Sequence, residues 1–448
     1  MPNRFDFGYG LSPEIVQLAQ SKSPDLIVTV DNGVASIAGV ETANAAGIDV
    51  IITDHHLPGD KLPAALALVN PNLIDSTFSS KSMAGVGVAY YVLSWVRQEL
   101  RSRDWFQQTQ REEPNLAQYL DLVALGTVAD VVPLDRNNRV LVHNGLLRMQ
   151  RGFTRPGIRA LAAVGKRDLS SISAQDLGFA IGPRLNAAGR LEDMSVGIRC
   201  LMTEDESEAK QLAGSLDVLN QTRRHLQQDM VADAELIVSQ FEVGEQATGL
   251  SVYHESFHQG VVGIVAGRLR EKFHRPAIVF ADAGGLAPDE LKGSARSIDG
   301  VNIRDVLDSI ATRYPGLLIK FGGHAMAAGL SIKKVHLSRF HKVFDKAVGQ
   351  VTTEEMLSAS LLTDGTLASE DLNLQTVALL DAGGPWGNGF AEPLFTGEFT
   401  LVSQRVVGDT HLKLVVKHGE QIIDAIAFSQ PMLSGQPTNV LMVYKLAV

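Results

Sequence analysis

Two predicted strands that run into metal-binding side chains constrain the fold of this chain most. Ile48 to Ile52 has the apolar pattern of a short buried strand, and the chain continues into Thr53-Asp54-His55-His56. Leu26–Val30 shows the same pattern and ends at Asp31. Ligands bind at the carboxyl ends of strands in open parallel sheets. Taken alone, Asp-His-His could simply be a polar strand end whose side chains cap the backbone. Packing does not explain why two successive strands both end in possible metal ligands.

The residue types indicate the kind of ion. Aspartate and histidine together suit a divalent ion of intermediate hardness, such as Mn²⁺ or Mg²⁺. A further acid, Asp130, follows a predicted buried helix at Tyr119–Leu125 and has apolar neighbours on both sides. A buried carboxylate needs a partner or a metal ion. A helix cap or a buried hydrogen bond is the alternative role for Asp130.

The order of elements predicts an α/β fold with a parallel sheet. Ser12-Pro13 is a helix start, the small residues from Val34 to Ala46 form a helix that Gly47 ends, and Leu66–Val69 is a third strand. A helix follows from the glycine-rich segment Ser82–Ala89, where tight helix packing is the expected role of the glycines. The polar stretch after it, from Arg101 to Glu113, is expected to be a mobile surface connection.

Polar motifs follow in the middle of the chain. Gly182 to Arg190 contains Asn186, two arginines and two glycines, which predicts either a phosphate-binding or a solvated loop. Residues 205–240 have helical spacing of Leu, Val and Met and few breakers, so we predict one long amphipathic helix. Its segment Asn220–Arg224 could contact a nucleic acid or be the wet side of the helix.

A second lobe is predicted to begin near Gly249, with alternating strands and helices. Ser294 and Arg296 stand two apart in an extended segment and therefore on one side of it, which suits a phosphate. His324 follows a glycine pair and could contact a phosphate or a metal, or be a turn residue. After a linker at 352–364, alternating segments predict an antiparallel β-barrel of the oligonucleotide-binding (OB) kind.

Composition limits the class of protein. The 448 residues carry a net charge of -10, yet residues 251–346 hold 14 Lys and Arg against 9 Asp and Glu. That basic block is compatible with phosphate binding. The single cysteine, Cys200, rules out an internal disulfide and predicts a reduced, cytoplasmic protein in which it is a core residue. No apolar run has the length of a membrane span, so no membrane partner is expected.

Six motifs in order resemble the DHH phosphoesterase superfamily, and within it the bacterial exonucleases specific for single strands. The resemblance covers nearly the whole chain. The motifs are Thr29–Gly33, Thr53–His56, Ala124–Asp130, Gly182–Arg190, Gly293–Ser297 and Gly322–His324. It implies a DHH domain at 1–203, a connector helix at 204–245, a DHH-associated domain (DHHA1) at 246–350 and an OB-like domain, possibly incomplete, at 362–448.

The same resemblance implies an activity and its residues. A two-metal nuclease using Mn²⁺ or Mg²⁺ would degrade single-stranded DNA from the 5′ end in repair and recombination, with a single-strand-binding protein and a helicase as possible partners. Asp31, His55 and Asp130 would bind the metals, and Asp54 and His56 would belong to the same catalytic cluster. The residues expected along the DNA are Asn186, Arg190, Gln221, Ser294, Arg296 and His324.

One departure from the family pattern affects the expected activity. Members carry an upstream Asp-x-Asp motif that supplies metal ligands, and no two aspartates stand two apart in this sequence. We therefore expect the chain to be truncated at its start and at least about a hundredfold less active than a version extended through that motif. The alternatives are a small-substrate DHH phosphoesterase and a non-catalytic scaffold that binds DNA.

Overall fold

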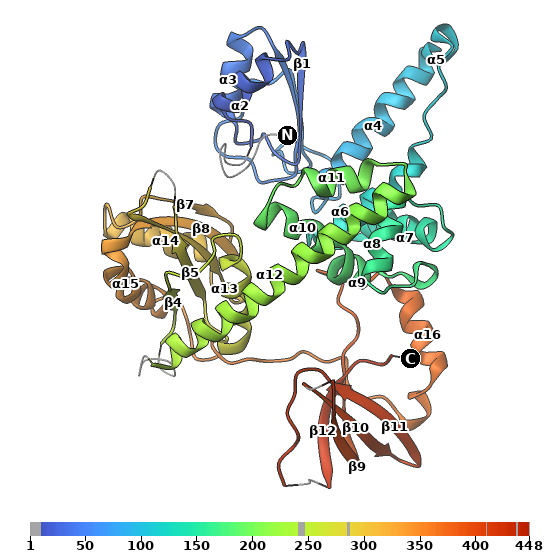
Figure 1. Cartoon of the computed structure of the whole chain (residues 1–448), viewed down its shortest axis with the longest axis vertical. Helices are drawn as coiled ribbons and strands as arrows, with labels where there is room; N and C mark the ends of the chain where they lie inside the picture. The colour runs from blue at the N-terminus through green and yellow to red at the C-terminus, as the bar shows by residue number, and fades with distance from the viewer. Residues whose placement is uncertain (1–9, 241–246, 285–286, 409, 436–437, 448) are drawn as a thin grey trace. The chain divides into compact units, whose positions relative to one another are not determined.

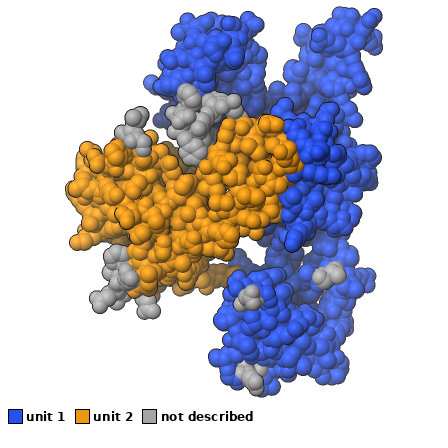
Figure 2. All heavy atoms as spheres, viewed as in Figure 1, with its two compact units in different colours: residues 1–183, 200–210, 362–448 blue, residues 184–199, 211–361 orange. Residues whose placement is uncertain are grey.

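The computed structural model describes residues 10–240, 247–284, 287–408, 410–435 and 438–447. The chain divides into two compact units, coloured separately in Figure 2. The first unit comprises residues 1–183, 200–210 and 362–448, and the second comprises residues 184–199 and 211–361.

Helices and strands alternate up to residue 69, helices alone fill residues 85–240, and strands and helices mix again from 250 to 349 (Figure 1). Strands dominate the described end of the chain. The helices are α2 (Pro13–Gln20), α3 (Ile37–Ala45), α4 (Gly85–Ser102), α5 (Trp105–Thr109), α6 (Leu120–Ala129), α7 (Arg136–Gln150), α8 (Pro156–Val164), α9 (Ala174–Asp176), α10 (Gly182–Leu191), α11 (Ser195–Met202), α12 (Glu206–Gln240), α13 (Val262–Phe273), α14 (Ile303–Arg313), α15 (Leu337–Gly349) and α16 (Leu374–Gly383). The strands are β1 (Leu26–Val30), β2 (Asp49–Thr53), β3 (Ala67–Val69), β4 (Leu250–Tyr253), β5 (Ala277–Asp282), β6 (Glu290–Arg296), β7 (Lys320–Gly323), β8 (Ala327–Lys333), β9 (Phe395–Val407), β10 (His411–His418), β11 (Gln421–Ala427) and β12 (Asn439–Tyr444).

The first three strands form the predicted parallel sheet in the order β1-β2-β3. Helices α2 and α3 pack on it through a core that includes Val16, Val40 and Ile52. The Ser12 hydroxyl accepts a hydrogen bond from the Ile15 amide, which confirms the predicted start of α2.

The prediction that Leu26–Val30 is a buried strand is wrong for one of its two faces. Leu26, Val28 and Val30 share one face and are 42%, 52% and 48% exposed. Thr29, on the opposite face, is buried. An apolar run identifies the strand, but it does not show whether a second layer covers the other face.

The connection after α4 lies at the surface, as predicted. Residues 101–113 contain the short helix α5, and Arg101 Nε donates to both carboxylate oxygens of Glu113 at 3.1 Å. This ion pair joins the two ends of the segment, and the mobility of the segment stays a prediction. Cys200 is buried, as predicted.

Two polar motifs in the middle of the chain differ in part from the predictions: the first is a helix and not a loop, and the second, on the predicted long helix, has two buried members beside the exposed Gln221, Thr222 and Arg224. Residues 182–191 form helix α10, where Arg184 is buried and pairs with Asp217 at 2.8 Å. The long helix is confirmed as α12, but its Asn220 and Arg223 are buried. Arg223 donates to Asn220 at 3.0 Å and to Gln227 at 2.8 Å. Helical spacing and the packing of neighbouring elements give these side chains their hydrogen-bond partners. The average polarity of a segment does not show such partners.

A five-stranded sheet forms the core of the second unit, in the order β4-β5-β6-β8-β7. Only β4 and β5 pair in parallel, and the other neighbours are antiparallel. Helices α14 and α15 contribute Leu307, Phe340 and Phe344 to a core with β5, β6 and β8. Helix α13 contributes Val265 and Leu269 to a separate apolar cluster.

The described end of the chain is an antiparallel sheet in the order β11-β10-β9-β12. Leu412, Leu414 and Val416 alternate inward along β10, which is the period-2 pattern that predicted a strand-rich region. Helix α16 precedes this sheet and was not predicted. Among the described residues, no helix has the length and apolar character needed to cross a membrane.

Candidate metal centre

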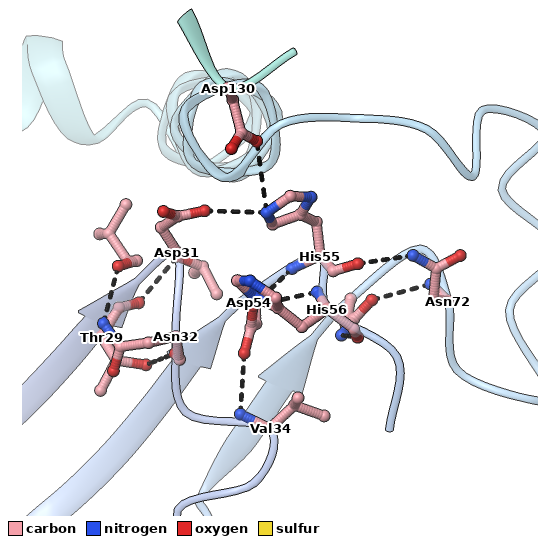
Figure 3. A network of polar contacts seen from close by, with 12 residues as sticks. Thr29, Asp31, Asn32, Val34, Asp54, His55, His56, Asn72 and Asp130 are labelled. Atoms are coloured by element: carbon pink, nitrogen blue, oxygen red, sulfur yellow. Dashed lines mark hydrogen bonds and ion pairs between the residues drawn. The ribbon is translucent and has the colours of Figure 1, made fainter. Parts of the chain in front are cut away.

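The carboxyl ends of β1 and β2 bring the predicted ligands together. The register pairs Val30 with Thr53, and the Asp31 amide donates to the Thr53 carbonyl at 2.9 Å. Asp31 and Asp54 therefore follow neighbouring strands at one edge of the sheet. Figure 3 shows their side chains beside His55 and His56, with Asp130 approaching from the end of α6.

The Asp31 backbone adopts a left-handed conformation with φ of +66°. Aspartate tolerates this conformation better than most residues. The turn is held on both sides, because Asn32 Nδ2 donates to the Val30 carbonyl at 3.0 Å and Thr29 Oγ1 donates to the Asn32 carbonyl at 2.6 Å. These bonds hold the backbone that directs the Asp31 carboxylate toward His55 (Figure 3).

His55 lies between two carboxylates. Its Nε2 is 3.0 Å from Asp31 Oδ1 and 3.4 Å from Asp130 Oδ2. Burial lowers the pKa of His55, but the hydrogen bond with Asp31 and the charges of Asp130 and Asp31 outweigh burial and raise that pKa. Burial raises the pKa of Asp130. The Asp130 side chain is nevertheless 37% exposed, so the predicted burial of this acid is only partial.

Asp54 is the hydrogen-bonding hub beneath the cluster and is 1% exposed. Its Oδ1 lies 2.7 Å from His56 Nδ1 and accepts from the His55 and His56 amides at 2.7 and 3.1 Å. Its Oδ2 accepts from the Val34 amide at 2.9 Å. Burial alone would raise the pKa of Asp54, but the hydrogen bond with His56 and those from the three amides lower it to about 2. The hydrogen bond to Asp54 raises the pKa of His56.

Three neighbours of the cluster were missed by sequence reasoning. Asn70 and Asn72 donate to the carbonyls of His56 and His55 at 2.8 and 2.6 Å, so they fix the backbone after the histidines. Gly85, at the start of α4, abuts Asp31: a Cβ at this position would lie 2.3 Å from Asp31 Oδ1. The glycine-rich sequence at 82–89 signalled tight packing, but not its target.

The donor set fits a divalent ion. Ligand atoms of Asp31, His55 and His56 all lie within 4.8 Å of one another. Ligands about 2.0–2.2 Å from one ion lie at most about 4.4 Å apart, so small side-chain rotations would let these atoms share an ion. Imidazole nitrogen and carboxylate oxygen are donors suited to Mn²⁺, and carboxylates also suit Mg²⁺.

The variant Asp54→Asn tests whether the Asp54 carboxylate holds the metal-binding residues in place. An amide cannot accept from every donor that surrounds Asp54, and the variant loses the charge that orients His56. We expect Mn²⁺ affinity, measured by calorimetry, to fall by about 10-fold to 100-fold. The stabilising effect of the wild-type carboxylate is complete above its unfolded pKa of 3.8 and is lost as pH falls toward about 2.

Thermal unfolding of both proteins between about pH 2 and pH 6 provides the second measurement. Because the variant lacks this carboxylate, the stability gap between the two proteins should narrow as the pH falls through that window. A gap that does not change with pH would contradict the assignment of Asp54 as a buried, ionised hub.

Comparison with known proteins places this metal centre in a family. Three family models match: DHH family, N-terminal domain, over residues 1–127; DHHA1 domain over 236–350; and RecJ OB domain over 363–448. The single-stranded-DNA-specific exonuclease RecJ of Dickeya dadantii is 51% identical over 456 aligned residues, which cover 100% of this chain and 78% of that protein. The chain belongs to the RecJ family.

Solved structures of the RecJ family contain divalent ions. RecJ from Thermus thermophilus in complex with Mn²⁺ is similar with a TM-score of 0.78 and 30% identity, covering 96% of this chain and 60% of that one. The Mg²⁺ complex from the same organism has a TM-score of 0.69 and 26% identity, with coverage of 96% and 65%. These structures support divalent metal use in the family.

The predicted DNA-contacting residues all lie in the second unit. Arg296 donates to the Ser294 hydroxyl at 3.1 Å, so these two meet as expected. Arg190 donates to the Gly260 carbonyl at 3.2 Å, and its charge contributes to lowering the pKa of Arg296. Asn186 is exposed on α10, Gln221 donates to Asp217 at 2.8 Å, and His324 follows β7. Their contact with DNA stays a prediction.

Proposed function

We propose that this chain is a metal-dependent exonuclease that hydrolyses phosphodiester bonds of single-stranded DNA from the 5′ end. The convergence of Asp31, His55 and His56, with Asp130 beside them, carries the proposal. The identity to RecJ exonucleases supplies the substrate class. Repair and recombination are the processes in which we expect the activity to serve.

The residues of the metal centre have separate roles in this proposal. Asp31, His55 and Asp130 bind metal, and the geometry adds His56 as a candidate ligand. Asp54 holds His56 and the strand-end amides in place. Two divalent ions, when bound, would lower the pKa of an attacking water and neutralise charge on the leaving oxygen. The aspartates supply negative charge and the histidines supply imidazole nitrogens, and these groups lie close together at the strand ends.

A separate group of polar residues in the second unit suits the 5′-terminal phosphate. Ser294 and Arg296 point to one side of β6, and a Cβ on Gly263 would lie 2.9 Å from both the Ser294 hydroxyl and an Arg296 nitrogen. Gly263 belongs to the first turn of α13, and the amino-terminal end of a helix attracts anions. Burial, followed by the charges of Arg190 and Arg270, lowers the pKa of Arg296. No carboxylate within the described ranges pairs with Arg296, so its charge is available for a phosphate.

Arg296→Ala should weaken binding of 5′-phosphorylated single strands by about 10-fold to 100-fold, because a charge-assisted contact contributes on the order of 1.5–3 kcal/mol. Strands without the phosphate should lose much less. Arg304→Ala, an exposed arginine on α14, is the matched control. Fluorescence anisotropy measures both strands. Equal losses for the two strands would assign Arg296 to general backbone contact or to folding.

The function itself is tested by Mn²⁺-dependent release of nucleotides from a long single strand, with a mononucleotide as competitor. The basic block of the second unit and the C-terminal region, matched by the RecJ OB domain, favour a long strand over a small substrate. Inhibition by equimolar mononucleotide would instead favour a small-substrate phosphoesterase. In the proposed role a helicase would supply the strand and a single-strand-binding protein would hold it.

A further inference from the structure

The turn that follows Asp130 has an unusual backbone. Val131 adopts φ of +60°, in the left-handed region, and its side chain is 65% exposed. A β-branched residue is a genuine outlier there and persists only when its surroundings hold it. Because Val131 is not anchored by burial, hydrogen bonds and neighbouring segments must hold this turn.

Asn388, far away in the sequence, supplies two of those bonds. Its Nδ2 donates to the Val131 carbonyl at 2.7 Å, and its main-chain carbonyl accepts from the Leu134 amide at 2.6 Å. One residue therefore bonds to both sides of the turn that begins directly after Asp130. Asn388 and this turn belong to the same compact unit.

The segment around Asn388 is itself fastened to the turn and to α7. Gly387 and Phe390 exchange two backbone hydrogen bonds of 2.9 and 3.1 Å. The Arg139 guanidinium of α7 lies 3.7 Å from the centre of the Phe390 ring, and Trp386 stacks on that ring at 4.8 Å. A Cβ on Gly389 would lie 3.0 Å from Pro133, so the backbones approach closely. These contacts hold the segment around Asn388 in place, and therefore also the side-chain amide that donates to Val131.

We propose that Asn388 is a positioning residue for Asp130, and that the segment before the C-terminal sheet thereby helps to form the metal centre. Asn388 is not one of the residues whose ligand atoms form the metal-binding cluster. It fixes the carbonyl of the residue next to Asp130, and with it the direction from which the Asp130 carboxylate approaches His55. The inference rests on the proposed role of Asp130 as a metal ligand.

The experiment compares Asn388→Ala with Asn439→Ala in the full chain. Asn439 is an asparagine of β12 whose side chain accepts from Thr400 at 3.3 Å, so it matches the lost hydrogen bonding at a place remote from the turn. We expect Mn²⁺ affinity, measured by calorimetry, to fall about threefold to tenfold in Asn388→Ala and to stay at the wild-type level in Asn439→Ala. Alanine keeps the main-chain carbonyl that accepts from the Leu134 amide, but loses the side-chain bond that holds segment and turn together. Amide hydrogen exchange at Leu134 should therefore rise only in Asn388→Ala.

Two further variants separate the possible failures. Asp130→Asn tests the ligand role by itself: unchanged Mn²⁺ affinity there would overturn the proposed function of Asp130. If Asp130→Asn weakens binding but Asn388→Ala does not, only the positioning inference is overturned. Val131→Gly removes the strain of the positive φ, so the effect of Asn388→Ala should shrink in that background. An undiminished effect there would mean that Asn388 acts through general stability, which would also overturn the inference.

Discussion

His55→Ala should lower Mn²⁺ affinity by at least about a hundredfold and abolish metal-dependent nucleotide release. Its Nε2 lies within 3.4 Å of both Asp31 and Asp130, so it is the side chain that joins the two acids. Without it, the remaining carboxylates repel one another and lack the nitrogen donor. Calorimetry with Mn²⁺ and a nuclease assay on a single strand measure the two effects.

His143→Ala is the matched control for this variant. His143 is exposed on α7 and lies outside the metal-binding cluster of the described residues. It should bind Mn²⁺ as the wild type does. Wild-type affinity in His55→Ala would mean that the ion binds elsewhere, and the candidate metal centre would have to be abandoned.

The second large effect should come from adding one methyl group, in Gly85→Ala. The new Cβ would lie 2.3, 2.6 and 2.8 Å from Oδ1, Cβ and Cα of Asp31. Two of these atoms are anchored to the backbone, so either Asp31 or the start of α4 must move. We expect Mn²⁺ affinity to fall by at least about tenfold, since small displacements of ligands are costly.

Gly87→Ala in the same helix provides the control. Its Cβ would meet only the terminal methyl group of Met83, at 2.7 Å, and a flexible methionine end can move aside. This variant should keep Mn²⁺ affinity near the wild-type value. If the two variants behave alike, the effect of Gly85→Ala comes from helix packing in general and not from displacement of Asp31.

Sequence reasoning located the strand ends of the centre for an identifiable reason. Parallel strands finish at one edge of a sheet, so apolar runs that end in Asp31 and in Asp54-His55-His56 place these side chains together. The resemblance to the DHH superfamily added Asp130, which periodicity alone left open as a cap or a buried acid. Elements with strong periodicity, such as β2 and α12, were predicted within a few residues.

Predictions that polar segments are exposed failed where another part of the fold buries a polar side chain and offers it a partner. Residues 182–190 were predicted as a loop, yet they lie in α10, where Arg184 is buried against Asp217. Asn220 and Arg223 are buried although their segment is polar. A polar side chain can be buried wherever another element offers a hydrogen-bond partner, and a single sequence does not show which elements meet.

The sequence by itself determined the strand–helix order, the ligand types and their place at the ends of two parallel strands, because side-chain periodicity and turn residues are local properties. Only the tertiary structure decided that Gly85 abuts Asp31, that Val34 donates to Asp54 and that Asn388 holds the turn beside Asp130. Those contacts join segments up to 257 positions apart. They arise from the packing of whole elements, which no local pattern encodes.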